Sequence, residues 1–253
     1  MKAPPPAPPR ATALLCGETN LPLPIGCDVC VPENTTISFS LEDARKIQIN
    51  TKDQVSCPEW HEHREGRITA SKFGLVMKRK KITEAFVQDI YYPKPFHSYA
   101  TNYGSQNEAL AKQKYIANFP ERHLHSCGLL LQPNLPFLGA TPDGIACDGS
   151  GGSGLLEIKC PYAARDMMVA EAVEKCKNFY IVKEGDTLTV SKTHHCYYQI
   201  QGQLLLSGLE YCDFVLYTKR DVFFDKVHRD TAFINNMIVQ LQKFHINHFI
   251  SKK

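Results

Sequence analysis

The sequence lacks any run of about 18 apolar residues, the length that a membrane-spanning helix requires. Its first residues also lack the apolar core that is typical of a signal peptide. The ten cysteines, spread from Cys16 to Cys212, do not show the tight and regular spacing of a small secreted disulfide scaffold. We therefore expect an intracellular protein without a membrane partner, in which most cysteines are small buried hydrophobes.

The sequence has little net charge, because 29 lysines and arginines oppose 26 acidic residues and leave a formal charge of +3. If the chain binds a polyanion, its positive charge must be concentrated locally. Residues 62–81 meet that condition, with two acidic side chains against seven basic ones: Arg64, Arg67, Lys72, Lys78, Arg79, Lys80 and Lys81. The run from Lys78 to Lys81 fits three roles: a contact to the DNA backbone, a nuclear address or a solvated surface.

The chain divides into three parts by composition. Residues 1–10 form a proline-rich tail, residues 11–58 a flanking region of unclear fold in which a helix can begin at Ser40, and residues 59–253 one domain. Periodicity predicts helices at 69–77, 102–118, 163–175, 194–207 and 231–249, and strands at 127–131, 135–140, 144–147, 155–159 and 211–218. A hairpin turn is expected at 184–186. This order indicates a mixed α/β layer fold.

Cys27 and Cys30 have the spacing of a metal knuckle, and Cys16, Cys57 and nearby histidines are candidate partners. The sequence has no second paired motif at a zinc-finger distance, so it does not favour a zinc site there.

The chemistry-bearing residues concentrate between Pro142 and Lys159. On a predicted strand Glu157 and Lys159 project to one face, because side chains alternate. A glycine-rich turn lets Asp143 and Glu157 lie side by side on neighbouring strands. Converging carboxylates repel each other unless a cation lies between them, and hard oxygen ligands suit Mg²⁺ or Mn²⁺. With an ammonium nearby, this set fits phosphodiester hydrolysis. The alternative is a solvated ion pair on a surface strand.

Residues 141–166, TPDGIACDGSGGSGLLEIKCPYAARD, resemble the active-site segment of the phage lambda exonuclease and YqaJ-type viral recombinase family. That family belongs to the PD-(D/E)xK nuclease superfamily. The Pro-Asp-Gly triplet, the glycine-rich turn, the Glu-Ile-Lys-Cys-Pro motif and the Arg-Asp pair fall in register. The resemblance covers roughly residues 60–220 and implies a restriction-endonuclease-like fold, with a mixed central sheet flanked by helices.

The resemblance also implies roles for residues outside that segment. The stretch GSQNE is similar to a family helix whose glutamate lies at the metal site, which points to Glu108. The family has a Gln-x-Gln whose second glutamine lies at the active site. We therefore expect Gln201 there, with Gln199 as a weaker candidate and Gln203 as an ordinary helix residue. The Ile158 carbonyl is expected to add a ligand to a metal held by Asp143 and Glu157.

An arginine and a serine of the family hold the 5′-terminal phosphate of DNA, and their spacing matches Arg64 and Ser71. A guanidinium binds phosphate in a bidentate manner, and a hydroxyl at a helix start adds to free backbone N–H groups. Without the resemblance, a surface arginine and a capping serine would be as good an interpretation. Arg67 and Lys72, in the same basic stretch, are further DNA-binding candidates.

The resemblance implies a Mg²⁺-dependent 5′-to-3′ exonuclease on duplex DNA in recombination or repair. Its partners would be DNA with a 5′-phosphorylated end and a single-strand annealing or repair protein. Family members form ring-shaped trimers, but no residue here reveals the subunit number. Two alternatives stay open: a nuclease of other polarity, or with a single-stranded or endonucleolytic substrate, and a DNA-binding module without catalysis. The expected location is intracellular, with the nucleus as one option.

Overall fold

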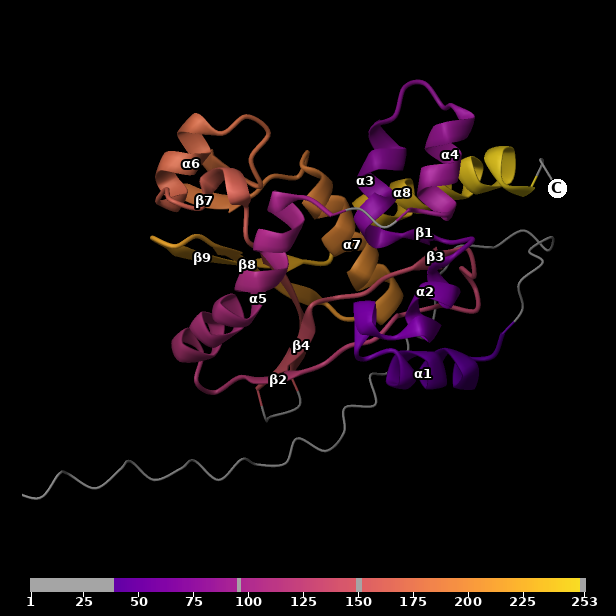
Figure 1. The fold of residues 1–253 in the computed structure, drawn as a ribbon, viewed down its shortest axis with the longest axis horizontal. Helices are drawn as coiled ribbons and strands as arrows, with labels where there is room; N and C mark the ends of the chain where they lie inside the picture. Colours follow the sequence, from indigo (N-terminus) through magenta and orange to yellow (C-terminus); the bar gives the residue numbers. More distant parts are fainter. Residues whose placement is uncertain (1–38, 95–96, 149–151, 251–253) are drawn as a thin grey trace, which may run out of the picture.

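Five strands form a mixed sheet at the centre of the computed structural model, which describes residues 39–94, 97–148 and 152–250 (Figure 1). The strand order is β2 (His123–His125), β4 (Gly144–Cys147), β5 (Ser153–Lys159), β8 (Tyr211–Tyr217) and β9 (Val222–His228). The strands β5 and β8 run parallel, and the other neighbours are antiparallel. The predicted mixed central sheet is therefore confirmed.

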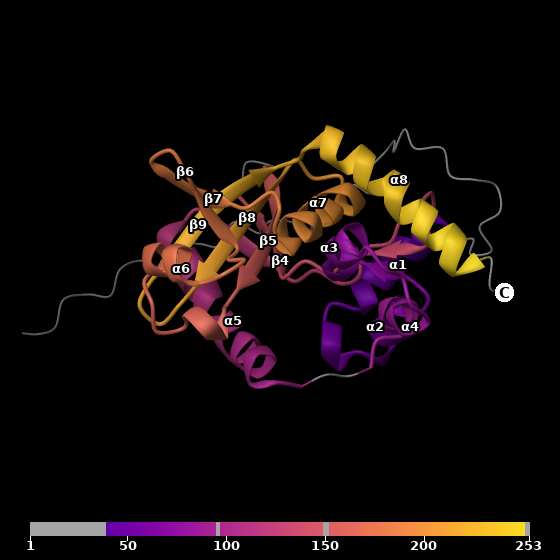
Figure 2. The ribbon, with the colours of Figure 1, turned by 90° about the horizontal axis from the view of Figure 1, so that it is seen from above.

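Helices cover both faces of this sheet (Figure 2). On one face, Leu155 and Phe214 belong to the main core with α3 (Ala70–Lys78), α7 (His195–Ser207) and α8 (Thr231–His248). On the other, Leu156, Ile158 and Val215 pack with α5 (Tyr99–Asn118). The alternation of strand side chains separates the two cores. It also assigns Glu157 and Lys159 to the face of Leu155, beneath α7.

A second, parallel pair of short strands fixes the approach to the sheet. β1 (Ile68–Thr69) pairs with β3 (Leu138–Gly139), with Thr69 opposite Gly139. The start of α3 therefore lies beside the segment that leads into β4. A third sheet is the hairpin of β6 (Ile181–Glu184) and β7 (Thr187–Val190), between α6 (Val169–Lys175) and α7. This hairpin confirms the turn predicted at 184–186.

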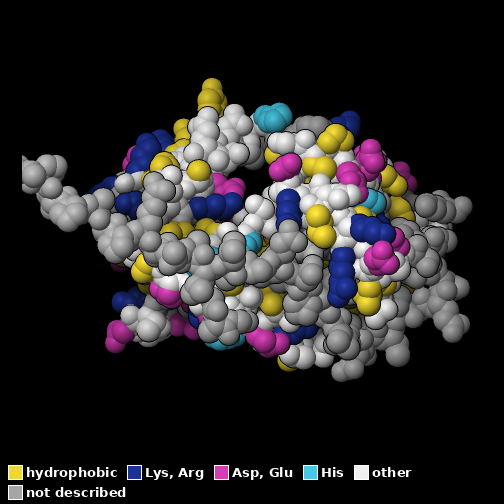
Figure 3. Space-filling view, turned by 90° about the horizontal axis from the view of Figure 1, so that it is seen from below, with side chains coloured by type: hydrophobic (Ala, Val, Ile, Leu, Met, Phe, Trp, Pro, Cys, Tyr) yellow, Lys and Arg dark blue, Asp and Glu magenta, His cyan; other side chains and the backbone are white. Residues whose placement is uncertain are grey.

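Residues 39–94 add four helices: α1 (Leu41–Asn50), the 3₁₀ turn η1 (Gln54–Ser56), α2 (Pro58–Arg64) and α4 (Glu84–Tyr91). A capping box at Ser40 starts α1, as the sequence suggested. The buried face of α1 packs against Leu129 and Leu131. The boundary at residue 59 stays a prediction, and the proline-rich tail and the Cys27–Cys30 knuckle lie outside the described residues. Seen from below, the molecular surface is hollowed, with basic and acidic side chains at the rim (Figure 3).

Most predicted helices and strands are confirmed, but the strand predicted at 127–131 is wrong. There the backbone forms one isolated bridge, between Leu130 and Ala140. Two of its other backbone polar groups bind side chains: the Leu129 N–H donates to Thr51 Oγ1 (2.8 Å) and the Cys127 carbonyl accepts from Gln54 Nε2 (2.9 Å). Side-chain partners replace a neighbouring strand, and the segment stays buried without becoming one.

The continuous helix predicted at 163–175 is also wrong. It is divided into a 3₁₀ turn, η2 (Tyr162–Ala164), and the later α6. The turn between β8 and β9 binds the intervening backbone, because the Arg165 carbonyl accepts from the Lys219 N–H (2.9 Å) and the Met167 carbonyl from Thr218 Oγ1 (2.8 Å). Those carbonyls are no longer available to a helix.

Two general expectations can be compared with the described residues. No helix among them is long and apolar enough to cross a membrane. Four of their cysteines are buried, as predicted for small hydrophobes: Cys127, Cys147, Cys196 and Cys212.

Candidate active site

Glu157 and Lys159 lie next to each other on the face of β5 that α7 covers. Glu157 is only 1% exposed, because its strand is at the centre of the sheet. A buried carboxylate requires charged or hydrogen-bonding partners. The Lys159 ammonium supplies one, since its Nζ donates to Glu157 Oε1. The predicted same-face arrangement of these two side chains is confirmed.

Asp143 lies where β4 begins, across from β5. Its N–H donates to the Leu156 carbonyl (3.1 Å), which continues the β4–β5 ladder by one bond. Beyond that point the ladder ends, and Asp143 Oδ2 itself accepts the Ile158 N–H (2.6 Å). The Ile158 carbonyl points to the same side of β5 as its N–H, because both groups of one strand residue share a direction. Two carboxylates and one carbonyl therefore converge at the opened edge.

The electrostatics of this cluster follow from burial. Desolvation, followed by the charge of Glu157, raises the pKa of Asp143 well above its ordinary value, and the Lys159 ammonium only partly opposes this. Burial disfavours the charged form of Lys159, but Glu157 and Asp143 together outweigh that effect and raise its pKa. Lys159 is therefore protonated at neutral pH. A further cation beside Asp143 would stabilise the ionised form of its carboxyl group.

Glu108 approaches the cluster from α5. Its charge raises the pKa of Asp143 and, after burial, that of Cys160, which places it within electrostatic reach of both. Its carboxylate is paired with Lys112 one turn along the helix (2.7 Å). The sequence prediction that Glu108 lies at the periphery of the site agrees with this position, and its catalytic role stays a prediction.

The glutamines of α7 require a correction, because Gln201 does not face the carboxylates. Gln199 Nε2 donates to Glu157 Oε1 (2.6 Å) and Gln203 Nε2 to Glu157 Oε2 (2.7 Å). Gln201 instead donates to the His228 carbonyl (2.8 Å) and accepts the Asp230 N–H (2.9 Å). Residues four apart share a helix face, whereas residues two apart do not. The weaker candidate, Gln199, and the residue set aside, Gln203, are the ones at the site.

The oxygen atoms of this cluster suit a divalent cation. No three His, Cys, Asp or Glu side chains of the described residues form a ready-made metal cluster. Mg²⁺ is usually held by one or two carboxylates and several waters, which Asp143, Glu157 and the Ile158 carbonyl can provide. In addition, Gln203 Oε1 is buried without a hydrogen-bond partner, an acceptor left over for a water in the site. The residues therefore fit a hard cation with bound water.

Arg64 lies at the C-terminal end of α2, close to the loop that carries Asp143. Its guanidinium stacks over the Trp60 ring, 3.9 Å from the centroid. Trp60 Nε1 in turn donates to Thr141 Oγ1 (3.0 Å), two residues before Asp143. Burial lowers the pKa of Arg64 to about 10, so it is still a cation at neutral pH. Its guanidinium has no hydrogen bond or ion pair to the residues described, which leaves the donors free for an anion.

Ser71 is exposed in the first turn of α3, as predicted, with its hydroxyl 3.3 Å from that of the N-cap residue Thr69. Lys72 is paired with Asp89 (2.7 Å), so its charge is already partly neutralised. The pairing of β1 with β3 brings this helix start toward the loop of Thr141. Ser71 and Arg64 thus lie on two different helices, α3 and α2, and both helices are tied to the segment that leads to Asp143.

Arg67 corrects a second prediction. It is 7% exposed, and its Nε and Nη1 donate to the carbonyls of Pro136 (2.9 Å) and His63 (2.6 Å). These bonds join α2 to the segment before β3. Arg67 is a buried structural residue, and the prediction that it contacts DNA is wrong.

A sequence profile of the YqaJ-like viral recombinase domain matches residues 59–210. The chain belongs to that family. The resemblance carried by residues 141–166 is therefore confirmed. No curated protein matches the chain.

Among solved structures, the chain is similar to the alkaline exonuclease LHK-Exo of Laribacter hongkongensis, with a TM-score of 0.59 and 24% identity over 76% of this chain and 93% of that one. It is also similar to SOX in a DNA complex, with a TM-score of 0.59 and 14% identity over 82% of this chain and 72% of that one. KSHV SOX in an RNA complex has a TM-score of 0.57 and 13% identity over 81% and 73%. This family member has the fold of alkaline exonucleases, and the predicted fold class is confirmed.

Proposed function

We propose that the chain is a metal-dependent deoxyribonuclease that degrades duplex DNA from a 5′-phosphorylated end, in recombination or repair. The observation that carries this proposal is the cluster of Asp143, Glu157 and Lys159 at the opened edge of β5. Membership of the YqaJ-like family and the fold shared with alkaline exonucleases support it.

Asp143, Glu157 and the Ile158 carbonyl would hold the cation, either Mg²⁺ or Mn²⁺. When bound, it would neutralise the charge that develops on the scissile phosphate. Lys159 stands beside Glu157 as a permanent cation and can donate to the attacking water or to a phosphate oxygen. Gln199 and Gln203 orient Glu157 by one hydrogen bond to each of its oxygens. Glu108 stands at the periphery, where it would help to position water.

The 5′ end would be held by Arg64 and Ser71. A guanidinium stacked on Trp60 is rigid, and a rigid fork of donors suits a terminal phosphate. Ser71 adds a hydroxyl near the free N–H groups at the start of α3. Lys72 would contribute less, because Asp89 already pairs with it. Substrate polarity in this proposal depends on these two residues and not on the carboxylates.

The test is digestion of a linear duplex, labelled at either end, with Mg²⁺, Mn²⁺ or a chelator. We expect loss of the 5′ nucleotide first, faster with a 5′ phosphate than with a 5′ hydroxyl, and no digestion with the chelator. Asp143→Asn and Lys159→Met should abolish digestion while DNA binding persists. Asp186→Asn, in the exposed β6–β7 turn, is the matched control for loss of one carboxylate charge.

Each alternative has its own outcome in that experiment. Full activity of Asp143→Asn would remove the site from consideration. Cleavage of circular or single-stranded DNA in preference to duplex ends would assign a different substrate. A protein that binds duplex DNA but releases no nucleotide with either metal would be a binding module that kept the fold.

A further inference from the structure

A pocket of about 210 Å³ opens between the end of α3 and the start of α7, away from Arg64 and Ser71. It joins two features that the proposed nuclease site leaves unused: the basic run that begins at Lys78 and the long segment between α6 and α7. Seven residues line it, none of them acidic: Lys78, Asn178, Phe179, Ser191, Thr193, His194 and His195. A polar pocket that contains a cation and no carboxylate is suited to an anion.

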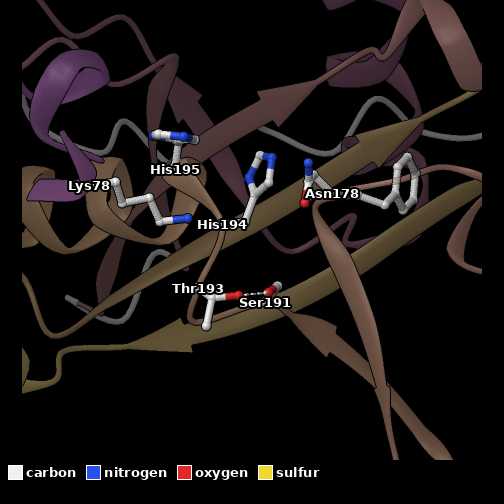
Figure 4. A pocket seen from close by; sticks show the side chains of 7 residues that line it. Lys78, Asn178, Ser191, Thr193, His194 and His195 are labelled. Carbon is white, nitrogen blue, oxygen red and sulfur yellow. Dashed lines mark hydrogen bonds between the residues drawn. The ribbon is translucent and has the colours of Figure 1, made fainter. Parts of the chain in front are cut away.

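Lys78 is the charged member of this pocket. It is the last residue of α3, and its ammonium points toward His194 in Figure 4. Lys78 forms no ion pair with the residues that the structure describes. Lys72, on the same helix, differs because it is paired with Asp89. Asn178 approaches the same imidazole from the opposite side (Figure 4). The positive charge of Lys78 is therefore available to a ligand between them.

His194 acts as a neutral donor toward the pocket. Its Nδ1 accepts the Cys196 N–H (3.1 Å), the bond that caps the start of α7. Burial, followed by His195, Lys78 and Lys159, lowers the pKa of His194 to about 4, so the ring is neutral at physiological pH. A neutral imidazole that accepts at Nδ1 carries its proton on Nε2. The orientation of His194 thus directs an N–H donor away from the helix.

The hydroxyls of Ser191 and Thr193 complete the donor set. They lie 3.1 Å apart, and either can donate to the other. One hydroxyl hydrogen is used between them, which leaves the second for a ligand. Ammonium, amide, imidazole and hydroxyl donors thus line one small volume, which is the set of groups that proteins use for phosphate oxygens.

We propose that this pocket binds an internal phosphate of the nucleic-acid strand, separate from the terminal phosphate assigned to Arg64 and Ser71. The inference rests on the proposed function. Ser71 and Lys78 lie at opposite ends of α3, seven residues and about 10 Å apart along its axis, which exceeds the advance per nucleotide of a strand. The charge of Lys159 contributes, after burial, His195 and Lys78, to lowering the pKa of His194, so the pocket is within electrostatic reach of Lys159.

The first measurement is duplex binding without divalent metal, which separates binding from hydrolysis. Lys78→Met removes the charge and keeps an unbranched side chain of similar length. Lys80→Met makes the same charge change in the same exposed run but outside the pocket, so it controls for long-range attraction. We expect Lys78→Met to weaken binding roughly tenfold and to reduce the slope of log affinity against log salt by about 0.9, with a smaller loss for Lys80→Met.

The second measurement identifies which phosphate is bound. Duplexes carrying one neutral methylphosphonate, moved stepwise from the 5′ end, should lose affinity for the wild type at one internal position. That loss should disappear in Lys78→Met, because the interaction between the ammonium and the phosphate is already absent in this variant. It should persist in Lys80→Met. A scan that is identical in all three proteins, or equal affinities for both variants, would overturn the pocket assignment.

A mononucleotide carries the same phosphate chemistry and is the other source to separate. Suppose that a 5′-mononucleotide binds the wild type but not Lys78→Met, and that the methylphosphonate scan of the wild type shows no loss of affinity at any internal position. The pocket then holds the released product, and its assignment to an internal phosphate of the strand is wrong. Failure of the proposed function looks different, since then the wild type does not bind duplex at all, or binds it without hydrolysis when metal is added.

Discussion

Replacing Gln199, Gln201 and Gln203 one at a time with methionine separates two roles that a single helix performs. Methionine keeps an unbranched apolar chain of similar length but removes the amide. Gln199 and Gln203 each bind one oxygen of Glu157, at 2.6 and 2.7 Å. Gln201 binds the His228 carbonyl and the Asp230 N–H, which join α7 to the turn between β9 and α8.

The magnitudes follow from what each change leaves behind. A hydrogen bond to a charged group contributes about 1.5–3 kcal/mol. If Glu157 must be held in position in the transition state, Gln199→Met and Gln203→Met should each reduce the rate of hydrolysis by about 10- to 150-fold. Gln201→Met leaves two backbone groups without their partner, and each unsatisfied group costs about 1–3 kcal/mol of the free energy of unfolding to the extent that it is buried. Its rate of hydrolysis should stay near that of the wild type. Gln199→Met with Gln203→Met should be less than additive, because both act through Glu157.

The assay is single-turnover digestion of a 5′-phosphorylated duplex with Mg²⁺, paired with urea unfolding of the same preparations. Single turnover isolates the chemical step from product release. The reasoning fails if Gln201→Met is as stable as the wild type yet loses tenfold or more in rate. It also fails if Gln199→Met and Gln203→Met both hydrolyse DNA at the wild-type rate.

Three further predictions concern packing, pH and the DNA end. Gly202→Ala should destabilise by about 1–3 kcal/mol, because the new methyl would overlap the buried Phe73 ring, whereas Gly104→Ala, with open space around it, should stabilise by about 0.5–1 kcal/mol; urea melts measure both. Between pH 6.5 and about 4, His194 is neutral in the folded protein but protonated in the unfolded chain. The free energy of unfolding should therefore fall as the pH drops through that window, by at most about 3 kcal/mol. His194→Asn should reduce this pH dependence in melts at a series of pH values, because asparagine can still cap the helix. Arg64→Lys keeps the charge but loses the planar stack on tryptophan, so the rate preference for a 5′ phosphate over a 5′ hydroxyl should fall about tenfold; an unchanged ratio would contradict the end-binding role.

The carboxylates and the lysine were predictable because a strand has a strict period of two. Once Glu157 and Lys159 share a strand, they share a face, and a glycine-rich turn returns Asp143 to its side. The helix of the glutamines offered no such constraint, because α7 has polar residues on two faces. Choosing between Gln199 and Gln201 requires knowing that β5 lies under one face and the β9–α8 turn under the other.

Other outcomes depended on contacts that are distant in sequence. Arg67 lies in a basic stretch that is typical of DNA-binding segments. Its burial could not be predicted, because the Pro136 carbonyl that it binds is 69 positions away in the sequence. Strand β9 was not predicted, because its side chains are mostly half-buried and show no clear alternation. The signal that could have identified Gln203 was present, since it is four residues from Gln199 and therefore on the same helix face.

The hydrogen bond from the Ile158 N–H to Asp143 has a consequence for entropy. A carboxylate on an open strand end would rotate among several positions and would lose that freedom on meeting a ligand. Asp143 has lost it already on folding, because its Oδ2 takes the place of the missing strand partner. Any cation or water that reaches Oδ1 meets an oxygen whose direction is set by the backbone of β5, so the ordering cost belongs to folding and not to binding.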